Sequence, residues 1–113
     1  MNVRIVLLPA FLLLFGSQTL LASDCKETPV GKCFSVHGRY AIYVEGDAIW
    51  VIGTKRLLST TDDSLDKMLE KAGWQDYAIY GEFTVCPLSR QQPGHMQGVC
   101  IQSYKNTRLA KCH

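Results

Sequence analysis

Apolar and polar side chains alternate along residues 34–44, a pattern that predicts a strand with one face toward a core. Residues 45–47, Glu-Gly-Asp, have the composition of a turn and precede a second apolar run at residues 48–52. Residues 55–59 follow as a third, shorter strand. Residues 36–53 are therefore expected to form a meander or hairpin, which the third strand follows.

A second pair of strands is predicted within residues 80–104, where two alternating runs flank Pro93 and Gly94. Pro followed by Gly is the pair that a type II turn prefers at its centre. Cys86 and Cys100 lie equally far from Pro93 and share the parity of the polar positions, so antiparallel pairing brings them side by side. We therefore predict a disulfide between Cys86 and Cys100.

One helix is predicted between these two groups of strands. Residues 60–63, Thr-Thr-Asp-Asp, are helix-capping residues, and Gly73 stands where a glycine ends a helix. Between them, apolar residues recur at the spacing of one helical face: Leu65, Met68, Leu69 and Ala72. The order of elements is that of a mainly β (α+β) fold, a small five-stranded OB-like barrel with its helix between strands three and four. The alternative is an open antiparallel sheet covered by the same helix.

Residues 1–23 have the pattern of an export signal. Arg4 supplies the positive charge, residues 5–15 form an apolar run, and the segment ends in small residues at Ser23. The run is shorter than the roughly 20 residues that a membrane span needs. We expect cleavage near Ser23, no stable membrane span afterwards, and a single disulfide-stabilised domain over residues 24–113 that is periplasmic or secreted.

The composition of the 113 residues agrees with a small exported domain. The whole chain carries twelve basic and ten acidic residues, and Arg4 belongs to the predicted signal, so the remainder is nearly neutral and has no basic run. A nucleic-acid partner is therefore not expected. All five cysteines follow the signal, and small exported domains commonly add disulfides to a modest core. Because five is odd, at least one cysteine is left without a partner within the chain.

The remaining cysteines allow two arrangements. Cys25 and Cys33 flank a short polar loop, which makes them a reasonable pair, whereas Cys33 with Cys112 would tie the first strand to the tail. Spacing alone does not choose between these pairings, nor does it say which of the three is unpaired. Asp24 separates Cys25 from the preceding small residues, which argues against a lipid on Cys25.

The candidate chemistry is sparse, and we identify no catalytic residue, no cofactor and no metal site. Cys33 and His37 are four residues apart on a strand, but a disulfide cysteine is the plainer interpretation in an exported domain. The possible ligands of a soft metal ion are His37, His95, Met96, His113 and a free cysteine. Their spacing in the sequence does not match that of a metal-binding motif.

A recognition surface is the remaining candidate. Planar side chains with a polar end suit sugars, peptides and protein interfaces. Six aromatic or polar residues that could form such a surface are predicted to point outward: Arg39, Tyr43, Trp50, Tyr80, Gln102 and Tyr104. Arg39 and Trp50 are the predicted contact residues. The sequence favours a non-catalytic exported module that binds an unknown protein or saccharide of the cell envelope. The alternative is a small periplasmic thiol-redox or metal-binding protein.

Four segments carry a resemblance to a known group of proteins. They are CFSVHGR at 33–39, IWVIGTKRLL at 49–58, YGEFTVCPL at 80–88 and PGHMQGVCI at 93–101. Together they resemble a family of small exported bacterial proteins without an assigned function. The resemblance implies a location in the envelope or outside the cell, and it carries no catalytic residue to this chain.

Overall fold

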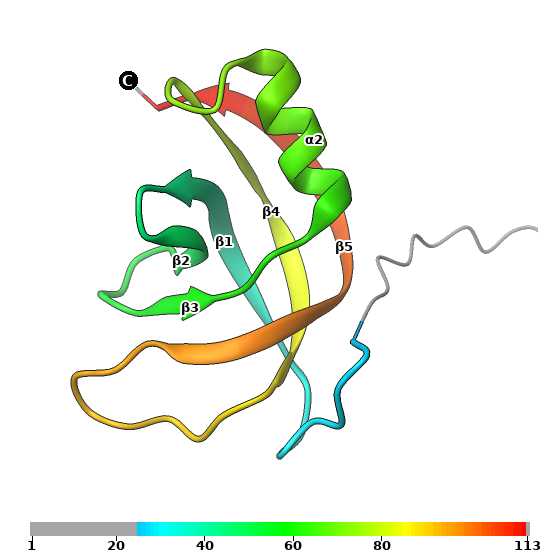
Figure 1. The fold of residues 1–113 in the computed structure, drawn as a ribbon, viewed down its shortest axis with the longest axis vertical. Coiled ribbons are helices and arrows are strands. Elements are labelled where there is room, and N and C mark those ends of the chain that lie inside the picture. The colour runs from blue at the N-terminus through cyan, green and yellow to red at the C-terminus, as the bar shows by residue number, and fades with distance from the viewer. Residues whose placement is uncertain (1–24, 113) are drawn as a thin grey trace, which may run out of the picture.

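The computed structural model describes residues 25–112, so the predicted signal at residues 1–23 and the candidate ligand His113 lie outside the described residues. Within the described part, the chain forms five strands and one helix: β1 (Phe34–Tyr43), β2 (Gly46–Val51), β3 (Leu57–Ser59), α2 (Asp63–Ala72), β4 (Tyr77–Pro87) and β5 (Gln97–Lys111) (Figure 1). No helix of residues 25–112 is both long enough and apolar enough to cross a membrane.

The strands close into a barrel in the order β1-β2-β3-β5-β4, with β4 pairing back onto β1. Neighbouring strands are antiparallel except for β3 and β5, which run parallel. The predicted mainly β fold, with its helix between the third and fourth strands, is confirmed. The arrangement is that of the OB-like barrel.

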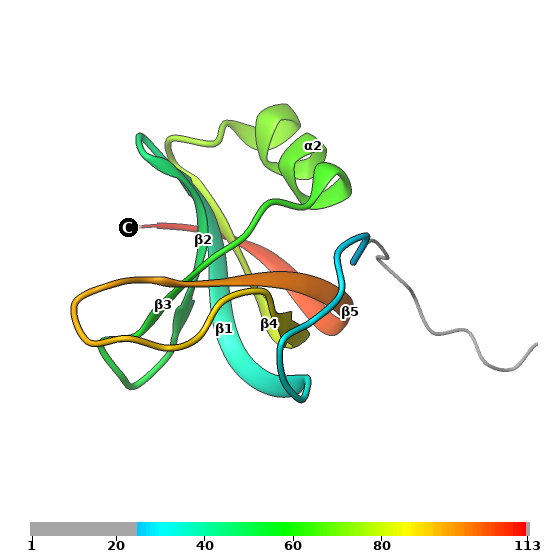
Figure 2. The ribbon, with the colours of Figure 1, turned by 60° about the horizontal axis from the view of Figure 1, so that its bottom comes forward.

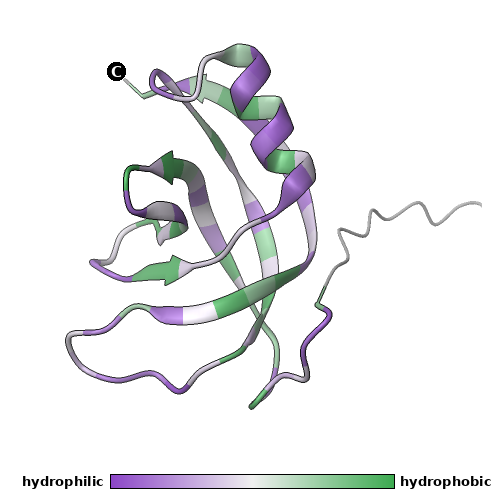
Figure 3. Ribbon diagram, in the orientation of Figure 1, coloured by the Kyte–Doolittle hydropathy of each residue, from purple (hydrophilic) through white to green (hydrophobic). Residues whose placement is uncertain are grey.

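The alternation that predicted the strands also separates the core residues from the surface residues. Apolar and polar positions alternate along the ribbon in Figure 3, and the apolar side chains that point inward form one cluster. Its fully or nearly fully buried members are Tyr40, Ile49, Leu58, Leu65, Leu69, Ile79, Phe83, Val85, Val99 and Ile101. All strands and the helix therefore share a single core.

Helix α2 begins and ends as its sequence predicts. The Asp62 carboxylate accepts a hydrogen bond from the Leu65 backbone N–H at 3.0 Å, and Gly73 adopts a left-handed φ of 111° that closes the last turn. Leu65 and Leu69 are buried against the barrel. Met68 was predicted on the same face but remains 42% exposed, because the buried contact is narrower than the predicted stripe.

Strand β5 is longer than the sequence pattern predicts, and it curves around the barrel. Its start pairs with β3 and the rest pairs with β4, with register shifts near Thr84 and Tyr80. Such bulges insert an extra residue and reverse the parity of the strand beyond it. The predicted outward position of Tyr104 is wrong for this reason: its ring packs on Phe83 with centroids 6.4 Å apart.

The disulfides connect different partners from those predicted. Cys25 bonds to Cys100 and Cys33 bonds to Cys86, so the predicted pairs Cys86 with Cys100 and Cys25 with Cys33 are wrong, as is the alternative of Cys33 with Cys112. The predicted hairpin register is nevertheless correct, because Cys86 and Cys100 are opposite each other on β4 and β5.

The reason for the exchanged partners is the position of β4 between two neighbours. Phe34 pairs with Val85, so Cys33 reaches Cys86 from the β1 side while Cys100 faces Cys86 from the β5 side. Cys100 is then left for Cys25, which lies in the N-terminal segment, residues 25–33. This segment lies outside the barrel, and Val30 donates a backbone hydrogen bond to Pro87 at 2.9 Å (Figure 2). Cys86 was expected on the outer face but is only 1% exposed beneath this segment.

Candidate binding face

A row of alternating aromatic and cationic side chains crosses four strands of the barrel. Trp50 on β2 is opposite Arg39 on β1, Arg39 is opposite Tyr80 on β4, and Tyr80 is opposite Arg108 on β5. The Arg39 guanidinium lies 5.3 Å from the centre of the Trp50 ring, and that of Arg108 lies 4.9 Å from the Tyr80 ring. Both distances are within cation–π range. We call these four residues the cation–aromatic row.

Arg39 and Trp50 are held in place by further hydrogen bonds. Nη2 of Arg39 donates to the Tyr43 hydroxyl at 3.0 Å, and the Trp50 indole N–H donates to the Thr54 carbonyl at 2.7 Å. The bond to Tyr43 is the largest cause of a raised pKa of Arg39, burial opposes it, and Tyr80 adds to it. The pair is therefore a fixed cation beside a fixed ring, in contrast to two freely rotating side chains.

The end of the row at Trp50 opens into a pocket of about 460 Å³. This volume is within the range of small-ligand sites, roughly 300–1,000 Å³. Two carboxylates line this pocket, Glu45 from the turn between β1 and β2 and Asp47 from the start of β2, and the rest of the wall is mixed. It consists of Arg39, Tyr43, Gly46, Ala48, Trp50, Thr54, Lys55, Leu57, Ser59 and Met96.

A second hollow of about 450 Å³ adjoins the first and shares Lys55, Leu57 and Met96 with it. It lies between the β2–β3 turn and the loop from β4 to β5, and its lining contains Arg56 and His95 but no carboxylate. Arg56 is held over the Phe34 ring, 5.2 Å from its centre. The two hollows together form what we call the binding face, with acidic groups at one end and basic groups at the other.

A buried polar cluster lies behind Asp47, at the junction of the barrel and α2. The hydroxyl of Tyr40 donates to Oδ1 of Asp66 at 2.7 Å, accepts from the Asp62 N–H at 2.9 Å, and lies 3.2 Å from Oδ2 of Asp47. Burial raises the pKa of Tyr40, so the phenol remains a neutral donor. The sequence analysis missed this cluster. The available signal was a tyrosine at an inward position of β1, since a buried hydroxyl needs a polar partner.

The carboxyl of Asp66 is the titrating member of the cluster. Burial, a hydrogen bond to Asp47 and the negative charges of Asp47 and Glu70 raise the pKa of Asp66 from 3.8 to about 6, and the bond from Tyr40 only partly opposes them. The folded protein thus holds this proton more tightly than the unfolded chain. Its stabilising effect is fully present below pH 3.8 and is lost as the pH rises through about 6.

Asp66→Asn is therefore expected to raise the melting temperature relative to the unsubstituted protein more at about pH 7.5 than at about pH 4.5. Asparagine still accepts a hydrogen bond from Tyr40 and carries no charge to repel Asp47. Thermal melts at the two pH values measure the difference. Asp63→Asn, which removes an exposed carboxylate from the same helix, is the control. An equal effect of Asp66→Asn at both pH values would contradict the raised pKa of Asp66.

Both predicted contact residues line the pocket, together with Tyr43, while Tyr80 continues the row outside it. Their role in binding stays a prediction. Gln102 is exposed elsewhere on β5, and the partly buried Tyr104 packs against the core. The sequence analysis missed Leu57 and Met96, the two exposed apolar residues that both hollows share; Met96 was weighed only as a metal ligand.

The candidate thiol and metal residues are not brought together. Cys33 is in a disulfide, so no thiol lies beside His37, and His95 lies in the loop before β5. Cys112, the one cysteine of residues 25–112 without a disulfide, lies at the far end of β5. Among these residues, the three-membered group with the geometry of a metal site is Cys25, Cys86 and Cys100, all of which are oxidised.

Comparison with known proteins adds no relative. No protein-family model matches the chain, and neither a curated protein nor a solved structure matches it. The resemblance to small exported bacterial proteins stays a prediction.

Proposed function

We propose that this protein is a non-catalytic binding module, exported to the periplasm or beyond, that binds a saccharide of the cell envelope on its binding face. Two disulfides in a domain of this size support an oxidising compartment. The export pattern of residues 1–23 supports the same location.

One observation carries the choice of ligand: the pocket places a fixed indole ring beside a fixed guanidinium and two carboxylates. A sugar ring has an apolar face of C–H groups, which packs on an aromatic ring, and an edge of hydroxyls, which both donate and accept hydrogen bonds. Trp50 suits the apolar face, Arg39 donates, and Glu45 accepts.

The position of the pocket agrees with this choice. In OB-like barrels the second and third strands and the adjoining loops form the usual ligand face, for oligonucleotides or for oligosaccharides. A fold by itself does not define a function, so the choice of a saccharide depends on the side chains that line the pocket. Nucleic acids bind to basic surfaces through their phosphates. The carboxylates of Glu45 and Asp47 in the pocket wall would repel phosphates, which argues against an oligonucleotide.

Titration with soluble oligosaccharides that carry neutral, amino and acidic sugars tests the proposal. The chain has two tryptophans, so a Trp74→Phe background leaves Trp50 as the one indole reporter. Trp50→Ala and Arg39→Ala are each expected to weaken binding at least about tenfold, which corresponds to about 1.4 kcal/mol. Binding to Trp50→Ala is measured by calorimetry, because this variant lacks the indole reporter. Arg108→Ala removes the guanidinium at the other end of the row and is expected to leave affinity unchanged.

The control separates a binding role from a structural one, because Arg39 and Arg108 make the same kind of contact on the same barrel. Equal losses for Arg39→Ala and Arg108→Ala would mean that the row only supports the fold. Binding of peptides in place of every saccharide would move the assignment to a protein-interaction module.

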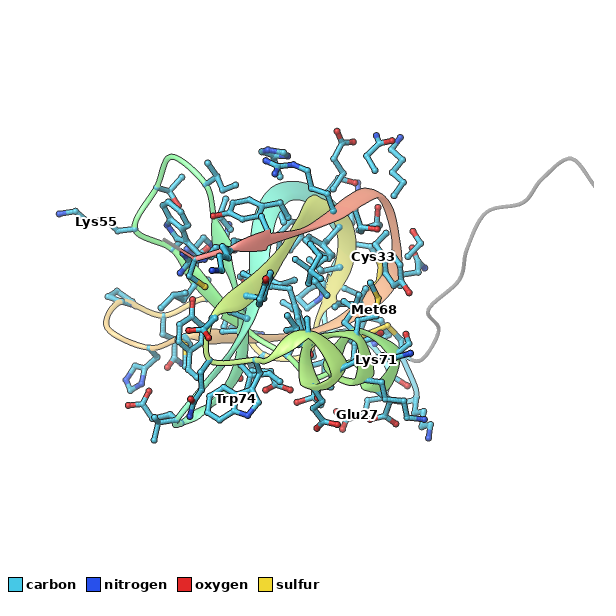
Figure 4. All side chains as sticks on the ribbon, turned by 90° about the horizontal axis from the view of Figure 1, so that it is seen from above. Glu27, Cys33, Lys55, Met68, Lys71 and Trp74 are labelled. Atoms are coloured by element: carbon cyan, nitrogen blue, oxygen red, sulfur yellow. A yellow bond between two sulfur atoms is a disulfide. The ribbon has the colours of Figure 1, made fainter. Side chains whose placement is uncertain are left out.

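The second candidate function, thiol chemistry, is favoured by a different observation at the opposite side of the molecule. Figure 4 shows Lys55 of the binding face and Cys33 far apart, on opposite sides of the barrel. The sulfur atoms of Cys25, Cys86 and Cys100 lie within 4.8 Å of one another, so the two disulfides are neighbours.

A further inference from the structure

Cys86 has two neighbours that compete for one bond. It lies on β4, with Cys33 on the β1 side and Cys100 directly opposite on β5. Opposed residues of antiparallel strands have Cα atoms about 4.5–5.5 Å apart, a separation that a disulfide spans without movement of the backbone. A bond between Cys86 and Cys100 is thus available to the same fold, although Cys86 is bonded to Cys33.

The two disulfides differ in their access to an external thiol. Cys33 is exposed, whereas its partner Cys86 is 1% exposed and Cys25 and Cys100 are partly buried. Attack by an incoming thiolate needs access to the sulfur, and the buried partner is then the leaving group. The structure therefore directs the first step to the sulfur of Cys33 and leaves the negative charge on Cys86.

We propose that these four cysteines form a thiol–disulfide exchange site whose co-reactant is a dithiol. One thiolate of the dithiol attacks Cys33, forms a mixed disulfide and releases the Cys86 thiolate. Cys86 then attacks Cys100, forms the Cys86–Cys100 bond and releases the Cys25 thiolate. The second thiol of the co-reactant resolves the mixed disulfide on Cys33. The dithiol loses two electrons and two protons and becomes a disulfide; Cys25 and Cys33 end as thiols.

Release of the N-terminal segment drives the second step. Residues 25–33 form no strand, and besides the disulfides they are held by the hydrogen bond from Val30 to Pro87. Once the Cys33 bond is broken, the Cys25–Cys100 bond is the one disulfide that still confines this segment, and it closes a sequence separation of 75 residues. Moving the bond to Cys86, on the strand already paired with β5, frees the segment and returns conformational entropy to it.

Limited reduction tests the exchange. The protein, with Cys112→Ser to remove the remaining thiol, is treated with less than one equivalent of dithiothreitol, quenched, alkylated and mapped without reduction. Trypsin separates all four cysteines by cutting after Lys26, Lys32, Arg39 and Arg90. The expected product has Cys86 linked to Cys100 and alkyl groups on Cys25 and Cys33. Alkylated Cys33 and Cys86 with Cys25–Cys100 intact would overturn the proposal, as would a Cys25–Cys86 link.

Single serine variants test the same step without a reductant. In Cys33→Ser, the free Cys86 is expected to displace Cys25, so most molecules carry the Cys86–Cys100 bond and one alkylated Cys25. In Cys25→Ser, the free Cys100 is expected to displace Cys33 and to reach the same bond. Cys86→Ser is the matched control and should keep Cys25–Cys100 with a thiol on Cys33. Retention of the original second disulfide in both test variants would overturn the exchange.

Discussion

Phe83→Ala is expected to lower the free energy of unfolding by about 3–5 kcal/mol, a large share of the roughly 5–15 kcal/mol of a typical domain. Phe83 is fully buried on β4 and lies between two other rings, with centroids 6.5 Å from Tyr40 and 6.4 Å from Tyr104. These rings belong to β1 and β5, so the cavity would open where three strands meet. The structure around it can collapse only by moving the barrel wall.

Thermal and urea unfolding of the oxidised protein measure this loss. Each kcal/mol corresponds to about 4–8 °C for a domain of this size, so the melting temperature should fall by about 12 °C or more. Phe83→Leu, which keeps most of the volume, should lose less. Leu109→Ala, on exposed β5 surface, should change stability by about 0.5 kcal/mol or less. A loss below about 1 kcal/mol for Phe83→Ala would contradict the assigned core.

Gly38→Ala is expected to destabilise the barrel by about 1–3 kcal/mol through overpacking. Gly38 is a buried residue of β1, opposite Val51 on one side and Gly81 on the other. An added Cβ would meet the Cγ2 methyl of Ile49 and would lie 3.1 Å from the Trp50 carbonyl oxygen. Because both contacts belong to the neighbouring strand, relief requires β1 and β2 to separate.

A second substitution makes the mechanism testable. Ile49→Leu removes the Cγ2 methyl at little cost, since swaps of equal volume cost less than about 1.5 kcal/mol. In the double variant, Gly38→Ala should therefore cost less than it does alone, a positive coupling in a double-mutant cycle. Gly98→Ala is the control, because its Cβ would meet only the Ser89 hydroxyl at 3.6 Å. Strict additivity at positions 38 and 49 would place the strain elsewhere.

The local features of the fold were predictable because they depend on neighbours in the chain. The alternation of residues 34–44, the capping residue Asp62 and the left-handed Gly73 each act within a strand or a turn. The order of these elements then restricted the fold to a small set of architectures. The long β5 escaped prediction because its bulges interrupt the alternation on which strand prediction relies.

The candidate site was predictable in part. Arg39 and Trp50 were found because parity alone places them on the outer face of adjacent strands. Leu57 and Met96 reach the same pocket from a third strand and from a distant loop, and no local pattern relates those positions. The same holds for Asp47 and Asp66, whose shared contact with the Tyr40 hydroxyl depends on how the helix packs against the barrel.

The amino-acid sequence by itself determined the order of the strands, the helix with its caps, and the register that puts Cys86 opposite Cys100. Periodicity, capping and turn chemistry are short-range effects, and they are written in consecutive residues. Only the tertiary structure decided which cysteines bond, because β4 lies between two strands and Cys86 has Cys33 on one side and Cys100 on the other. A choice among spatial neighbours depends on barrel closure, which brings together residues that no sequence spacing connects.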